Sequence, residues 1–77
     1  MTTRRLTGYQ QSICEIAAEI GRIGIEPRHV EAWMRVEHST LDGLSRGQFR
    51  EEVAVAIACI DHAGTDRSES LARSFGL

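Results

Sequence analysis

An unbroken run of eight apolar residues at positions 53–60 constrains the fold of this chain more than any other feature. Upstream of it, Ser45 and Gln48 have the spacing of a capping box, in which each side chain bonds a backbone N–H of the other residue. Gly64 follows the run, and glycine is the usual residue at the end of a helix. We therefore predict a helix between Ser45 and Gly64. Because apolar side chains lie almost all round this helix, we expect it to be the central one, buried on two sides.

Two further helices are predicted upstream of this one. Thr7 and Gln10 form a second capping box, and Gly21 marks the end of the helix that they begin. Pro27 is a residue favoured at the first helical position, and it opens a helix that extends to His38. In both segments the apolar residues recur at spacings of three and four, so each helix has one face for a core.

A short fourth helix and one turn complete the predicted elements. Asp66 and Glu69 have the spacing of a third capping box, which predicts a helix from there towards the last residue. Between the second and third helices, residues 39–43 are expected to form a turn in which Gly43 supplies a positive φ. No segment shows the sustained apolar–polar alternation of a β-strand.

The predicted fold class is therefore all-α: one small domain, residues 1–77, with three main helices plus a short C-terminal fourth helix, and residues 1–6 as a flexible N-terminal arm. Hydrophobic residues make up 42% of the chain and charged residues 26%, which is typical of a folded domain rather than a disordered chain. No stretch approaches the roughly 20 apolar residues of a membrane span. No apolar segment follows Arg4 and Arg5, as a signal peptide requires, so we expect a cytoplasmic protein with free thiols.

The sequence offers few groups for catalysis or metal binding. Cys14 and Cys59 are expected to be small buried hydrophobes. Cys59 next to Asp61 and His62 is the one conceivable nucleophile and base, but a bundle of this size is expected to have little room for a pocket of about 300–1,000 Å³. We therefore predict no catalytic residue, no cofactor, no metal and no small-molecule substrate. The histidines lack the spacing of a zinc site and are expected at the surface near helix ends: His29, His38 and His62.

The small size of the chain is the main indication of function. A domain of 77 residues buries only about 60% of the surface that its unfolded chain exposes, and a partner often supplies further stability. We predict a non-enzymatic accessory or regulatory protein that binds another protein or a second copy of itself. The size of the chain alone also suggests an origin in a phage or mobile element. Trp33 is expected in the core rather than at the interface. The predicted interface residues lie on faces of mixed charge: Arg28, Glu31, Arg35, Arg46 and Arg50.

Residues 20–38 resemble part of a known family. The stretch GIEPRHVEAWM within them places Ile25, Val30, Trp33 and Met34 where the turn and recognition helix of a homeodomain-like helix-turn-helix have their packing residues. The resemblance covers about a quarter of the chain. It implies an alternative function as a DNA-binding regulator.

This resemblance also implies which residues would touch DNA. The basic candidates are Arg4, Arg5, Arg28 and Arg35. The family's adenine-reading asparagine is replaced by Val36, which has no group to bond a base edge. We therefore place nucleic acid second to a protein partner, and a structural subunit of a larger assembly third. The positions that correspond to the family's base-reading residues are Ala32, Arg35, Val36 and Ser39.

Overall fold

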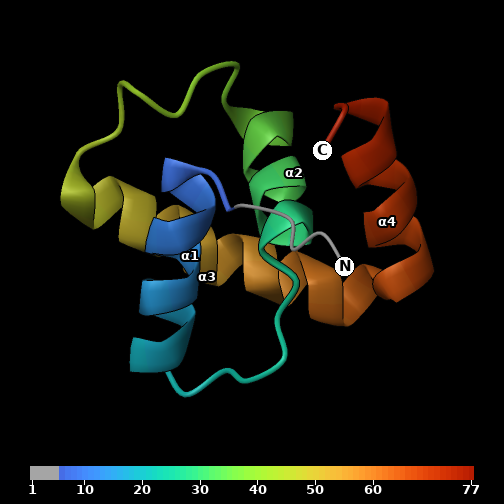
Figure 1. Ribbon diagram of the computed structural model, residues 1–77, viewed down its shortest axis with the longest axis horizontal. Coiled ribbons are helices and arrows are strands. Elements are labelled where there is room, and N and C mark those ends of the chain that lie inside the picture. The colour runs from blue at the N-terminus through green and yellow to red at the C-terminus, as the bar shows by residue number, and fades with distance from the viewer. Residues whose placement is uncertain (1–5) are drawn as a thin grey trace.

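The computed structural model describes residues 6–77, and the four predicted helices are present in it (Figure 1). No strand occurs in this part of the chain, so the predicted all-α fold is confirmed. The predictions for residues 1–5, including Arg4 and Arg5, lie outside the described residues. In chain order the helices are α1 (Gly8–Glu19), α2 (Pro27–Glu37), α3 (Arg46–Ala63) and α4 (Thr65–Ser74).

Two of the predicted capping boxes are confirmed. At the start of α1, the Thr7 hydroxyl accepts a hydrogen bond from the Gln10 N–H (3.1 Å), and the Gln10 side chain accepts one from the Thr7 N–H (3.3 Å). Ser45 and Gln48 make the same reciprocal pair at the start of α3, at 3.2 and 2.9 Å. Each box satisfies backbone donors that a helix leaves unpaired in its first turn, so these helices begin where the sequence predicts.

The predicted third capping box is wrong. Gly64 has a φ of 93° and serves both as the last cap of α3 and as the first cap of α4. Because the chain turns at this single glycine, α4 begins at once with Thr65, and Asp66 lies inside its first turn. The side chain of Glu69 is then turned towards α2, where it has a different role.

The helices form two layers, with α3 crossing behind the other three (Figure 1). The central helix is α2, which packs against α1, α3 and α4. The prediction that the third helix is central and buried on two sides is wrong, because its three neighbours all lie on one side of it. Accordingly α3 buries Val53, Ala56 and Ile57 on its inner face. The buried residues of α2 are His29, Val30, Glu31, Ala32 and Met34.

The core lies where α1, α2 and α3 meet. Trp33 is half-buried against it, and its indole N–H donates to the hydroxyl of the fully buried Ser68 on α4 (3.0 Å). Leu41 inserts from the segment between α2 and α3, which turns there without the positive φ expected at Gly43. No helix of the described residues is long and apolar enough to cross a membrane. The buried apolar cluster comprises Ile13, Ala17, Val30, Met34, Leu41, Val53, Ala56 and Ile57.

Candidate protein-interaction surface

Arg28 serves the fold rather than an open surface. Its guanidinium donates to both carboxylate oxygens of Glu69, at 2.5 and 2.9 Å, and to the carbonyl of Leu77 (2.8 Å). The buried His29 ring approaches the same carboxylate, with 3.0 Å between Nε2 and Oε1, and Arg73 donates to it from one turn further along α4. Hydrogen bonds from Arg28, and after it from His29, hold the pKa of the Glu69 carboxyl well below its usual range. This cluster joins α2 to α4.

Glu31 and Arg35 also act within the fold. Glu31 is only 2% exposed, so the expectation that it lies on an exposed mixed-charge face is wrong. Its carboxylate accepts hydrogen bonds from the Gln10 amide on α1 and from Arg35 one turn along α2, both at 3.1 Å. A buried carboxylate needs such partners, because an unpaired one is strongly destabilising. Of the five predicted interface residues, Arg28 and Glu31 therefore bond between helices, and Arg35 pairs with Glu31 within α2.

The other two predicted interface residues, Arg46 and Arg50, lie beside a groove between α1 and the start of α3. Its volume is about 680 Å³, so the expectation that a bundle this small leaves little room for a pocket is wrong. Tyr9 and Phe49 stack within it, with 6.3 Å between their ring centroids. We call this feature the α1–α3 groove. Its apolar lining is Tyr9, Ile16, Leu41, Leu44 and Phe49, and its polar rim includes Ser12, Glu15, Glu19, Asp42, Ser45, Arg46 and Arg50.

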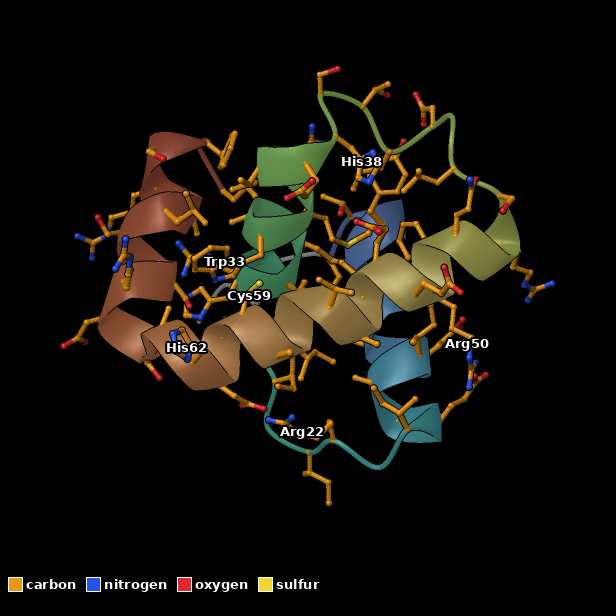
Figure 2. The ribbon with its side chains drawn as sticks, turned by 180° about the vertical axis from the view of Figure 1, so that it is seen from behind. Arg22, Trp33, His38, Arg50, Cys59 and His62 are labelled. Carbon is orange, nitrogen blue, oxygen red and sulfur yellow. The ribbon has the colours of Figure 1, made fainter. Side chains whose placement is uncertain are left out.

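Charges of both signs surround this apolar lining. Arg50 on α3 forms an ion pair with Glu19 on α1, which connects the two walls at one end (Figure 2 labels Arg50). Among residues 6–77, Arg46, Glu15 and Asp42 make no ion pair within the chain. The groove therefore offers an apolar floor with both positive and negative groups at its edge.

The groove does not assemble a set of groups for nucleophilic catalysis. Neither a histidine nor a cysteine is among its lining residues. Of its two serines, Ser45 already uses its hydroxyl to cap α3. The lining therefore holds no Ser–His or Cys–His pair, the commonest combinations of nucleophile and base.

The cysteines and histidines are spread over the molecule. Cys14 is exposed, so its predicted burial is wrong, and Cys59 is partly buried at the edge of α3 near Trp33 (Figure 2). The burial of His29 contradicts its expected surface position, whereas His62 is exposed on α3. No three metal-ligating side chains gather anywhere in the part of the chain that the structure describes.

The two described arginines that the helix-turn-helix resemblance assigns to DNA are paired within the fold. Arg28 and Arg35 are bonded to Glu69 and Glu31, as described above. Of the positions that correspond to base-reading residues, Ala32 is fully buried, whereas Val36 and Ser39 are exposed. DNA binding through α2 stays a prediction.

Comparison with known proteins gives no further information. No family model, curated protein or solved structure matches this chain.

Proposed function

We propose that this chain is a cytoplasmic, non-enzymatic accessory or regulatory protein that acts by binding another protein. The observation that carries the proposal is the α1–α3 groove, whose apolar floor the described chain leaves open. Covering such a floor stabilises a complex by about 25 cal/mol for each Å² of apolar surface removed from water. Concave apolar sites with a few polar groups at the edge are where proteins most often hold a ligand or a partner's anchor residue.

The rim of the groove favours a protein over a nucleic acid. Glu15, Glu19 and Asp42 would repel phosphates, and only Arg46 and Arg50 could attract them. A protein segment can present an apolar anchor between charges of both signs, which matches this rim. The partner that fits is therefore a helix or extended segment with an apolar side chain for the Tyr9–Phe49 floor, an acidic group for Arg46 and a basic group for Glu15 or Asp42.

Two glycines allow a direct test of the groove. Gly47 lines it, whereas Gly8 does not; both lie near the start of a helix, and a Cβ at either position would meet no atom within 4 Å. Gly47→Trp therefore fills the groove without straining the backbone, and Gly8→Trp is its matched control. Tryptophan also has a better helix propensity than glycine, so neither variant should melt at a lower temperature.

The test is affinity capture from the native lysate with the wild type and both variants, after nuclease treatment and at moderate salt. We expect one protein to be retained by the wild type and by Gly8→Trp, and to be lost with Gly47→Trp. Equal capture by both variants would refute the groove as the binding site. Recovery that disappears with nuclease, and that falls steeply as salt rises, would support the DNA-binding alternative instead.

A further inference from the structure

The other described residues leave the outer face of α3 uncovered. Figure 2 views the molecule from this side, with α3 crossing in front of the other helices. Ala54, Val55 and Ala58 are all exposed there, and Val55 keeps 54% of its surface accessible. These three residues belong to the apolar run at positions 53–60, and no other helix of residues 6–77 covers them.

Four residues form a continuous line along this face. Glu51, Val55, Ala58 and His62 are separated by four, three and four positions, and all four are exposed. This alternation is the spacing of the contact seam in a coiled coil, because it keeps successive side chains on one side of the helix. We call this line the α3 seam. Its two middle residues are apolar, and its two ends carry an acid and a histidine.

We propose that two copies of this chain associate through the α3 seam, with their α3 helices antiparallel about a two-fold axis midway between the levels of Val55 and Ala58. In this arrangement Val55 of one copy lies level with Ala58 of the other. The small Ala58 side chain lets the two helix axes approach closely, as ridge-into-groove packing requires. A two-fold axis also makes the interface self-complementary, since each contact occurs twice.

The charges at the ends of the seam select the second copy and its orientation. Antiparallel pairing sets Glu51 of one copy level with His62 of the other, and it does so at both ends. A parallel pair would instead set Glu51 against Glu51. Neither Glu51 nor His62 forms an ion pair with another of residues 6–77.

The two acidic groups beside the seam are already paired within the chain. Glu52 lies 3.0 Å from His38, and Asp61 binds Arg22 through two hydrogen bonds of 2.7 Å. The seam therefore keeps its own complementary pair for a second molecule. None of its four residues lines the α1–α3 groove, so this proposal and the proposed function can fail separately.

A matched pair of valine substitutions tests the surface. Val55→Glu places two like charges beside the two-fold axis, whereas Val36→Glu makes the same change on α2 at a valine that is 53% exposed. Both sites are helical and exposed, so both variants should fold, as circular dichroism can verify. Sedimentation velocity is measured from about 10 µM to about 1 mM, the range in which a small interface dissociates. We expect dimers of the wild type and of Val36→Glu, and monomers of Val55→Glu. A wild type that stays monomeric throughout, or equal association of the two variants, would overturn the proposal.

A charge exchange tests the orientation. In the antiparallel pair, His62→Glu sets two carboxylates opposite one another and should weaken association by about tenfold. Glu51→Arg removes the carboxylate that faces His62 and should also weaken association. The double variant restores an opposite-charge pair at both ends and should recover most of the loss. In a parallel pair the double variant would still face like charges, so failure of the double variant to recover would overturn the antiparallel arrangement.

Discussion

Different kinds of side chain form the α2–α4 contact and the α1–α3 contact. Charged and hydroxyl groups hold α4 on α2, through the bonds of Glu69 with Arg28 and His29 and through the bond of Ser68 with Trp33. In contrast, α1 meets α3 mainly through apolar side chains such as Tyr9 and Phe49. The first contact leaves its ionic groups partnered inside the protein, whereas the second leaves an apolar floor and charged rim available. The first contact therefore contributes to stability, and the second carries the groove for which we propose a partner.

The largest effect is expected in the apolar core where α1, α2 and α3 meet. Ile57 is 3% exposed on the inner face of α3, so Ile57→Asp would bury an unpaired carboxylate. We expect a loss of about 4 kcal/mol or more in the free energy of unfolding, enough to unfold a domain of this size. Far-UV circular dichroism and thermal melting measure it. Val55→Asp, two residues away on the exposed face, is the control and should keep the helical signal. If both variants stay folded, the inner face of α3 is not the core.

A smaller loss is expected from the apolar contact. Phe49→Ala removes one ring of the Tyr9–Phe49 stack and enlarges the α1–α3 groove. Since Phe49 is only partly buried, we expect about 2 kcal/mol, below the 3–5 kcal/mol typical of a fully buried phenylalanine. Urea unfolding at pH 7 and at pH 5 measures the loss, which should be the same at both because no titrating group is removed. A clear pH dependence of this loss would show that the α1–α3 contact, like the α2–α4 contact, depends on titrating groups.

The polar contact should instead respond to acid. The pKa of Glu69 is lowered in the folded protein, so its ionised form contributes stability above about pH 4.5, the ordinary value for this carboxyl. That contribution is lost as the pH falls towards the folded-state pKa. Glu69→Gln keeps the shape but removes the charge, so the variant should melt at a lower temperature than the wild type at pH 7.

Melting the wild type and Glu69→Gln at pH 7 and pH 3 isolates this contribution. The gap between their melting temperatures should narrow at pH 3, because the Glu69 carboxyl of the unfolded chain is then largely protonated, which favours unfolding of the wild type but not of Glu69→Gln. Asp61, whose pKa is lowered by its hydrogen bonds from Arg22, remains in both proteins and gives the same acid response in each. An unchanged gap would mean that the charge of Glu69 does not hold α4 in place.

The sequence predicted the helices well because their signals are local. The boxes of Thr7 with Gln10 and Ser45 with Gln48 join residues only three positions apart, so pattern alone finds them. Partners distant in sequence gave no such signal: Glu69 meets Arg28 and His29 across 41 and 40 positions. For the same reason Arg28 and Arg46 looked equivalent in the sequence, although one is bonded within the fold and the other lies at a rim.

The apolar run at positions 53–60 led to a different error. Its composition is correct for a helix buried on two sides, but residues 6–77 form only three other helices, and all of them lie on one side of α3. Hydrophobic pattern shows which surface favours burial, and the number of neighbours decides how much of it is covered. The uncovered part is the surface for which we propose a second copy.

The smallest change in stability is expected from replacing single glycines by alanine. Gly47 lies in the first turn of α3, has no positive φ and has open space beside its Cα, so Gly47→Ala should stabilise the domain by up to about 1 kcal/mol. Gly8→Ala at the start of α1 should give a similar gain, whereas Gly64→Ala should destabilise because its φ is 93°. Thermal melts of the three variants measure these differences.

Partner capture by the same variants tests the groove. If Gly47→Ala melts at a higher temperature but captures less partner than Gly8→Ala does, the glycine at the groove costs stability and keeps space for a ligand. A gain in melting temperature with no change in capture would instead show that this end of the groove is not in contact with the partner.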